Sequence, residues 1–180
     1  MIIFLDTEFT DFINCDLLSL GAVSEDGKHE FYVEINDYTP EYRSQFVLDN
    51  VVPLMDPVKY GKSYNMASHD LVDWINSLPT DEIVIIVDYH KDADFMRDML
   101  RIKTVNKRVS YYYITPAFVN MLHERGISTT PEKELEAMRA MVTGTLEYFT
   151  IDPRQHHALV DAKANRCGWV KGYEFAKSGA

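Results

Sequence analysis

The sequence predicts an α/β protein in which helices flank one mixed β-sheet, with three antiparallel strands first and parallel strands after them. Two observations support this class. Residues 2–35 read as three short strands joined by turns, which is the order of an antiparallel meander. From residue 66 onward, segments with helical spacing of apolar residues alternate with short apolar runs. That alternation is typical of helices packed on parallel strands.

The three N-terminal strands are expected at Ile2–Asp6, Asp16–Ser24 and Lys28–Ile35. The Asp26-Gly27 pair before the third strand is the strongest short-range signal for a hairpin turn. The next segment, Asn36–Asn65, is polar and contains three prolines. It is long for a loop, so we expect it to carry a short helix or to form part of a functional site.

The rest of the chain alternates between helical and strand patterns. Strands are expected at Glu82–Val87 and Val109–Ile114, and helices at Met66–Leu78, Asp92–Ile102, Thr115–Gly126, from Thr130 onward, and at Ala158–Phe175. Thr115 and Thr130 each precede a proline, which is the favoured order for a helix cap and the first helical residue. The run at residues 82–87 is continuously apolar, so this strand is expected to be buried on both faces.

Length and composition indicate a single globular domain over residues 1–180, with 46% hydrophobic and 26% charged residues. No apolar run approaches the ~20 residues of a membrane span, and no signal-peptide pattern opens the chain. Cys15 and Cys167 have no paired spacing. Free thiols are therefore expected, together with a cytoplasmic location and no membrane partner.

The net charge of −10 argues against a broad grip on a nucleic-acid backbone, which uses basic surface. This net charge is compatible with an enzyme that holds one strand end through metal ions. One basic cluster is present, and it is either a solvated surface or a rim that contacts phosphate. Its members are Arg97, Arg101, Lys103, Lys107 and Arg108.

Asp6 and Glu8 follow an apolar strand start and stand two positions apart. Side chains alternate between the faces of a strand, so both carboxylates point the same way. Two like charges repel, so a hard divalent cation such as Mg²⁺ or Mn²⁺ is expected between them. The alternative is a solvated strand end with two ordinary acids.

Two later segments offer further acids. Asp88, Asp92 and Asp94 follow the buried strand at residues 82–87. Asp161 follows three apolar residues on a helix that should be packed, so this acid needs a partner. The alternatives to a metal ion are a salt bridge to Lys163 or Arg166, or simple exposure.

These segments resemble the three motifs of the DnaQ-like 3′→5′ exonucleases of DEDDh type, which have the ribonuclease H-like fold. Asp6-Thr7-Glu8 matches the first motif, in which an Asp-x-Glu pair ends the first strand. Asp92, with Phe95 and Met96 after it, resembles the second motif. His156 and Asp161, with Ala158 and Ala162 at the small positions, match the third. The motifs occur in family order, and the short chain is most similar to the small exoribonuclease branch.

The chain departs from the family pattern around the second motif. Asp88 and Lys91 stand where an Asn and a Phe are common, so Asp88 or Asp94 could replace Asp92 as the second-motif acid. After Glu8 the chain has Phe9 instead of the frequent Thr. The resemblance places Thr7 and Phe9 at the substrate, with Phe9 as an apolar surface against the terminal base.

The resemblance implies two-metal hydrolysis of phosphodiester bonds, in which Asp6, Glu8, Asp92 and Asp161 hold two Mg²⁺ ions, or Mn²⁺ in their place. It also implies Glu8 and His156 as catalytic groups, with His156 as general base. On a continuous helix His157 would share a face with Asp161, and a helix that begins at Asp152 would favour it. We expect His156, because the family His lies in the segment before the helix.

The expected function is a 3′→5′ exonuclease that acts on single strands, with RNA favoured, and releases nucleoside 5′-monophosphates. The rivals are a DNA-directed exonuclease, an endonuclease of the same fold, and a non-catalytic interaction module. A dehalogenase-type phosphatase is disfavoured, because its Asp-x-Asp motif would require an Asp where Glu8 stands. Relatives of this type are often dimers, so a homodimer is an option. The methionine-containing helix over Glu132–Met141 would pack either within the chain or against a second copy.

Overall fold

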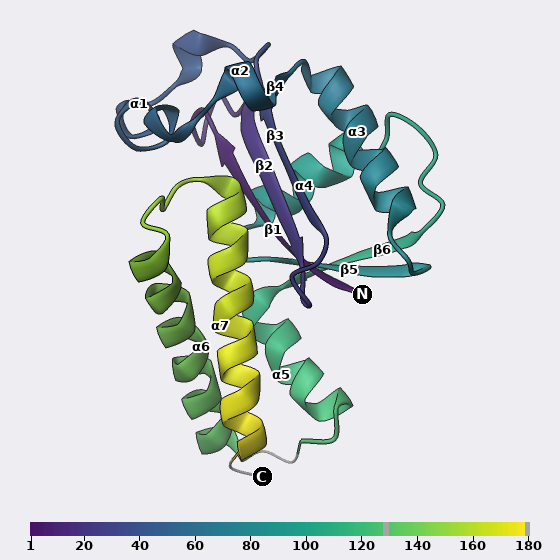
Figure 1. The fold of residues 1–180 in the computed structure, drawn as a ribbon, viewed down its shortest axis with the longest axis vertical. Helices are drawn as coiled ribbons and strands as arrows, with labels where there is room; N and C mark the ends of the chain where they lie inside the picture. The colour runs from purple at the N-terminus through teal and green to yellow at the C-terminus, as the bar shows by residue number, and fades with distance from the viewer. Residues whose placement is uncertain (128–129, 179–180) are drawn as a thin grey trace.

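The computed structural model describes residues 1–127 and 130–178, and within them one six-stranded mixed sheet has the order β4-β3-β2-β1-β5-β6 (Figure 1). The strands are β1 (Ile2–Phe9), β2 (Leu17–Ser24), β3 (Glu30–Ile35), β4 (Gly61–Lys62), β5 (Glu82–Val87) and β6 (Arg108–Tyr113). Strands β1, β2 and β3 form an antiparallel meander, whereas β5 runs parallel to β1 and β6 runs parallel to β5. The short β4 runs parallel to β3. This topology is ribonuclease H-like and confirms the predicted fold class.

Helices cover both faces of this sheet (Figure 1). Helices α3 and α4 pack on one face, and α5, α6 and α7 lie on the other, where α6 and α7 run side by side. Their bounds are α1 (Gln45–Asn50), α2 (Pro57–Tyr60), α3 (Tyr64–Ser77), α4 (His90–Met99), α5 (Ile114–Glu124), α6 (Pro131–Ile151) and α7 (Ala158–Ser178), with 3₁₀ turns at Pro40–Tyr42 and Val52–Leu54. No helix in the described ranges has both the length and the apolar character needed to cross a membrane.

Strand β1 divides its side chains between two hydrophobic cores. Ile3 and Leu5 pack in the core beneath α3 and α4. Phe4 belongs to the core on the other face, where its ring meets Trp169 of α7 edge-on at 5.4 Å. Because side chains alternate along a strand, Asp6 and Glu8 continue the Phe4 face and point toward α7.

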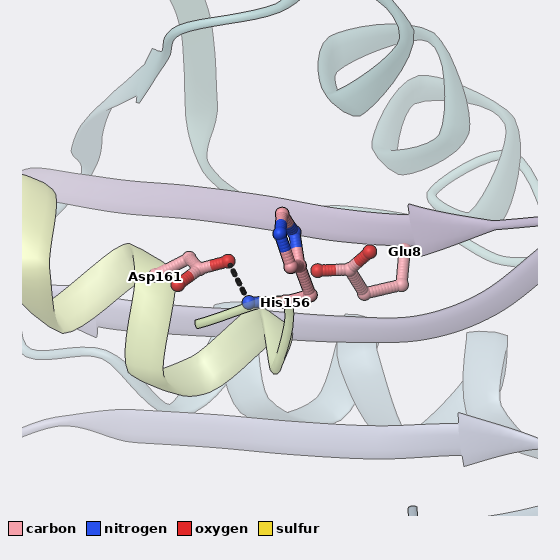
Figure 2. A group of neighbouring side chains, drawn as sticks. All are labelled: Glu8, His156 and Asp161. Atoms are coloured by element: carbon pink, nitrogen blue, oxygen red, sulfur yellow. Dashed lines mark hydrogen bonds between the residues drawn. The ribbon is translucent and has the colours of Figure 1, made fainter. Parts of the chain in front are cut away.

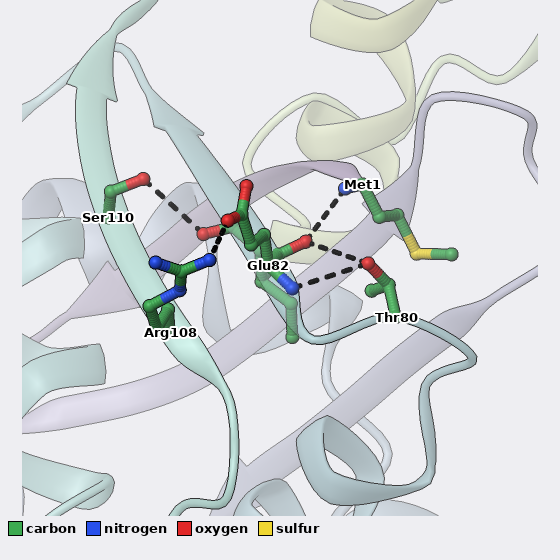
Figure 3. Close-up of polar contacts among 6 residues, drawn as sticks. Met1, Thr80, Glu82, Arg108 and Ser110 are labelled. Atoms are coloured by element: carbon green, nitrogen blue, oxygen red, sulfur yellow. Dashed lines mark hydrogen bonds and ion pairs between the residues drawn. The ribbon is translucent and has the colours of Figure 1, made fainter.

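The N-terminal ends of the parallel strands are tied together by polar contacts (Figure 3). The Met1 amino group and the Thr80 hydroxyl both donate to the Glu82 carbonyl oxygen, at 2.8 and 3.1 Å. The Arg108 guanidinium pairs with the Glu82 carboxylate. These contacts fix β1 against β5 and β6, and so fix the carboxyl ends of β1 and β5 relative to one another.

Several predicted boundaries move. Strand β1 continues to Phe9, so Glu8 lies inside the strand and not after it. Helix α4 begins at His90, which puts Asp92 in its first turn. Helix α5 begins at Ile114, so Thr115 is not its cap, whereas Thr130 caps α6 as predicted. The Asp26-Gly27 turn is confirmed, with Gly27 at a backbone φ of +74°.

The segment 36–65 contains α1, α2, both 3₁₀ turns and β4, which confirms the expected short helix. The methionines of α6 pack within the chain: Met141 is buried, and Met138 packs against the same core. Residues exposed on α6 include Leu135, Val142 and Leu146. A homodimer stays a prediction.

Candidate metal centre

The first two acids of the site are held by the centre of the sheet. In the β1–β2 ladder, Asp6 pairs with Gly21 and Glu8 with Ser19. The register then shifts between Glu8 and Phe9. Such β-bulges are common beside active sites, because they re-aim a side chain or end the pairing.

Gly21 allows the start of α7 to lie directly on the sheet. A Cβ atom at this position would stand 2.2 Å from the backbone nitrogen of Leu159 and 2.4 Å from its Cα. No side chain fits between these two backbones. Because Gly21 has no Cβ, the first turn of α7, which carries Asp161, packs directly on β2 at the residue that pairs with Asp6.

His156 lies just before α7 and is joined to Asp161 by its backbone. The His156 N–H donates to Asp161 Oδ2 at 2.9 Å. The N–H groups of Val160 and Asp161 bond to the carbonyl of His157 at 2.7 and 3.0 Å, which starts the helix. His156 has a backbone φ of +71°, in the left-handed region that non-glycine residues rarely adopt.

Glu8, His156 and Asp161 form the first group of potential ligands. One ligand atom from each lies within 4.8 Å of the others. Figure 2 shows the His156 ring between the two carboxylates, with Glu8 reaching in from β1 and Asp161 from α7. The fold thus brings Asp161 and His156, which were predicted from the third motif, next to Glu8 of the first motif.

Asp6, Asp88 and Asp92 form a second group, whose ligand atoms also lie within 4.8 Å of one another. Asp88 follows the end of β5 and is exposed, and its Oδ2 accepts from Asn165 Nδ2 at 3.3 Å. Asp92 is buried, and its Oδ1 accepts a 2.6 Å hydrogen bond from the Thr7 hydroxyl. Its Oδ2 accepts from the Tyr89 N–H at 3.3 Å.

These placements bear on the alternatives that the sequence left open. Asp88 and Asp92 both join the cluster, so two of the three acids considered for the second motif lie at the site. Asp94 is exposed and pairs with Arg97 at 3.1 Å. His157 is buried away from the first group and stacks on Tyr32, with ring centroids 4.5 Å apart. Because α6 ends at Ile151 and α7 starts at Ala158, no early helix carries His157 toward Asp161.

The two residues predicted at the substrate lie differently. Thr7 is buried on the α4 side of β1, and its hydroxyl is engaged by Asp92. This contact orients Asp92, and a contact of Thr7 with substrate stays a prediction. Phe9 lies at the end of β1, where its ring is 6.0 Å from that of Phe95 and 6.2 Å from that of Tyr89.

Burial and mutual repulsion hold these acids in an unfavourable electrostatic state. Burial, followed by the charges of Asp161, Asp92 and Asp88, raises the pKa of Glu8 to about 8. Burial is also the largest cause that raises the pKa of Asp92 to about 7 and that of Asp161 to about 7. The pKa of Asp6 is raised well above its ordinary value by burial and by the charges of its acidic neighbours.

One atom of the cluster is left without a partner. Among residues 1–127 and 130–178, Asp161 Oδ1 is buried and has no hydrogen bond. A buried carboxylate oxygen in that state costs free energy unless a cation or donor meets it. The donor set is mostly carboxylate oxygen, which hard divalent cations such as Mg²⁺ and Mn²⁺ prefer. The residues present therefore fit a divalent metal centre.

Asp88 and Gly21 were not assigned by the motifs, although each carries a signal. Asp88 directly follows a buried strand that was expected in the parallel part of the sheet, where strand ends gather ligands. Gly21 interrupts an apolar strand, which often marks a close approach of another backbone.

A comparison with protein-family models and a search of curated proteins both find no match to this chain.

Proposed function

We propose that this protein is a metal-dependent 3′→5′ exonuclease of the DnaQ-like DEDDh type. Its substrate would be the 3′ end of a single-stranded nucleic acid, with RNA favoured, and its product a nucleoside 5′-monophosphate. The observation that carries the proposal is the convergence of five acids and one imidazole from three distant segments on two adjacent ligand groups. A non-catalytic module would have no need to keep four buried or half-buried acids with raised pKa values.

The two ligand groups suggest where two ions would be held. Glu8 and Asp161 would hold one Mg²⁺ or Mn²⁺, and Asp6, Asp88 and Asp92 the other. When bound, such a pair of ions supplies charge stabilisation to the attacking and leaving oxygens of an in-line displacement. The remaining tasks fall to the side chains, which align the phosphodiester and move the proton.

His156 is the general base in this proposal. Burial lowers its pKa, which keeps the imidazole neutral near pH 7 and able to accept a proton from water. The water oxygen bonds to phosphorus as the bond from phosphorus to the 3′-oxygen of the preceding nucleotide breaks. The terminal nucleotide leaves as a 5′-monophosphate, and the shortened strand keeps a 3′-hydroxyl.

The preference for RNA and the cytoplasmic location rest on two separate observations. The first comes from the similarity to the small exoribonuclease branch, and it would require a contact with the 2′-hydroxyl. The second comes from two free cysteines without a paired spacing.

The test is digestion of 5′-labelled RNA and DNA oligomers with free or blocked 3′ ends, in Mg²⁺, Mn²⁺ or EDTA. We expect a ladder that shortens from the free 3′ end with either metal, and no products in EDTA. Asp161→Asn should abolish the ladder. Asp94→Asn is the matched control, because Asp94 is an exposed acid paired with Arg97. Cleavage of circular RNA would indicate an endonuclease, and intact substrate in every lane would contradict the proposal.

A further inference from the structure

Residues 152–157, between α6 and α7, carry the proposed general base and are joined to the sheet by a stacked pair of rings. Within the described part of the chain, the hydrogen bonds of this segment all stay within the segment and the two helices that it joins. The His157 ring stacks on Tyr32 of β3, with an angle of 19° between the ring planes. The His156 ring meets Phe46 of α1 edge-on at 4.9 Å. Because Phe46 is 53% exposed and His157 is buried, the stack on Tyr32 is the more constrained of these two contacts.

The His157 ring is placed by packing and not by a hydrogen bond at Nδ1. Its Nδ1 atom is buried and has no hydrogen-bond partner among the residues that the structure describes. The carbonyl of the same residue accepts the N–H groups of Val160 and Asp161, which start α7. The position of this ring on Tyr32 therefore bears on His156, which directly precedes it, and on the first turn of α7.

Tyr32 is itself held at its hydroxyl and at its ring. The hydroxyl donates to Glu34 Oε1 at 2.8 Å, and the Asp56 N–H donates to the same oxygen at 2.9 Å. Glu34 is fully buried. The Tyr60 ring meets the Tyr32 ring edge-on at 5.0 Å. Tyr32 thus presents a fixed, flat surface to His157.

The register of the sheet aligns this surface with the metal centre. In the β2–β3 ladder Tyr32 pairs with Gly21, and in the β1–β2 ladder Gly21 pairs with Asp6. The start of α7 packs directly on Gly21. A proposed metal ligand on β1 and the segment that carries the proposed base thus rest on one row of residues across the sheet.

We propose that Tyr32 is a positioning residue for the hydrolysis, and that it holds His156 in place through the stacked ring of His157. The inference rests on the proposed function and adds to it a residue that would touch neither substrate nor metal ion. A general base must lie within about 2.6–3.2 Å of the group whose proton it takes. A ring fixed beneath the next residue along the chain can set that distance without taking part in the reaction.

Exchanges at the two stacked rings test this role on the oligomer that the wild-type protein cleaves. Tyr32→Leu and His157→Leu should each lower kcat by about tenfold or more, because an error of about 1 Å in positioning can cost about 10²-fold. KM should stay within about twofold of the wild-type value, since the stack serves the transition state and not the binding of the strand. Tyr32→Phe and His157→Phe keep an aromatic pair and should keep kcat within about threefold.

A double-mutant cycle separates positioning from a general loss of structure. In the His156→Ala protein, Tyr32→Leu should change kcat by less than about twofold, because the group that Tyr32 positions is gone. A loosened fold would instead lower kcat equally with and without His156. Titration of Tyr32→Leu with Mn²⁺ should show a smaller loss of affinity than the about tenfold that follows removal of a support behind a metal ligand.

Tyr111→Leu is the matched control. Tyr111 is also a half-buried strand tyrosine, but it lies on β6 at the far edge of the sheet, where Arg97 stands over its ring at 4.3 Å. The exchange should lose stability in urea titrations and leave kcat unchanged.

Wild-type kcat in Tyr32→Leu would overturn this inference while the proposed exonuclease stands. A loss that is equally large in the His156→Ala protein would also overturn it. If Tyr32→Leu does not fold, equal kcat values for His157→Leu and His157→Phe would have the same meaning. If the wild-type protein cleaves no oligomer in Mg²⁺ or Mn²⁺, the proposed function fails first and this inference falls with it.

Discussion

His156 occupies a strained backbone conformation at the point where the proposed base meets a proposed metal ligand. Its φ of +71° lies in the left-handed region, which costs a non-glycine residue about 1–2 kcal/mol. The same residue donates its N–H to Asp161 Oδ2, so the conformation fixes the imidazole and the carboxylate together. Strain of this kind concentrates at functional sites, and it can be measured separately from catalysis.

We predict that His156→Ala and His156→Gly both lower kcat by at least about 10²-fold, because both remove the proposed general base. Their stabilities should differ. Glycine tolerates a positive φ, so His156→Gly should exceed His156→Ala by about 1 kcal/mol in the free energy of unfolding. Activity assays and urea titrations measure the two effects, and isothermal titration with Mn²⁺ should show that metal binding survives.

His157 provides the control for this assignment. Its ring is stacked on Tyr32, so His157→Phe should keep the packing and retain activity within about threefold of the wild-type rate. Activity that survives in His156→Ala but disappears in His157→Phe would reverse the roles of the two histidines.

At this scale, residue types and motif order predicted which acids and which imidazole the fold brings together. Asp6 and Glu8 could be placed on one face from strand alternation alone, whereas the choice of His156 came from the family resemblance. The hydrogen bond of Thr7 to Asp92 could not be predicted, because it depends on how α4 packs against β1. The participation of Asp88 depends on β5 lying beside β1, which the local sequence does not encode.

The contact between β2 and α7 determines how the third motif reaches the first. These two elements come from opposite ends of the chain and meet at Gly21, where a Cβ atom would overlap the backbone of Leu159. Backbone on both sides leaves no flexible side chain to give way. A change in this contact should therefore move Asp161 relative to Asp6 and Glu8.

We predict that Gly21→Ala lowers activity by more than about tenfold, because an error of about 1 Å in positioning can cost about 10²-fold in rate. It should also destabilise the protein by about 1–3 kcal/mol through overpacking. Activity and urea unfolding check both effects. Gly126→Ala is the control, since it introduces strain at a φ of +73° but meets no atom within 4 Å; it should lose stability and keep full activity. Wild-type activity in Gly21→Ala would contradict this account of the contact.

Regular elements were more predictable than irregular ones. Strand β5 has the predicted bounds, and α3 is shifted by one or two residues, because apolar periodicity marks both elements. The segment 36–65 was predicted to carry a short helix or to form part of a functional site, but the contact of Phe46 with His156 could not be read from local patterns. Phe46 reaches the His156 ring because α1 packs the neighbouring Val47 in a cluster with Leu18. Such long-range contacts leave no periodic signal.

The acids of the proposed metal centre place several negative charges close together, and bound metal ions would neutralise them. Four acids of the site have raised pKa values, three of them at about 7 or 8. Between pH 4 and these values the unfolded chain has released these protons, while the metal-free folded protein still holds them. The free energy of unfolding then falls as pH rises through this window.

We predict that the metal-free protein is less stable at pH 8 than at pH 5. The fall in Tm should reach at least about 3 °C, which corresponds to about 1 kcal/mol for a chain of this size. Saturating Mg²⁺ should raise Tm more at pH 8 than at pH 5, because it binds the deprotonated acids. Thermal melts in EDTA and in Mg²⁺ measure this. The double variant Asp92→Asn, Asp161→Asn should show a smaller difference in Tm between pH 5 and pH 8. Equal Tm values for the wild-type protein at the two pH values in EDTA would contradict the prediction.

The basic cluster offers the last test of how the molecule meets its substrate. Each of its five cations lies within 4.0 Å of an acid: Arg97 pairs with Asp94, Arg101 with Asp98, Lys103 with Asp73, Lys107 with Asp81 and Arg108 with Glu82. At least one member of each pair is exposed, and ion pairs at the surface contribute only about 0–1 kcal/mol to stability. Their charge is nevertheless compensated locally, which favours a solvated surface over a phosphate-contacting rim.

We predict that Arg101→Gln combined with Lys103→Gln changes KM for single-stranded RNA by less than about twofold. Two lost phosphate contacts would reduce the slope of log KM against log salt by about 1.4, since each contact on a single strand contributes about 0.7. We expect that slope to remain unchanged between about 50 and 200 mM KCl. A slope reduced by more than one in the double variant would contradict this and would assign the cluster to the path of the substrate.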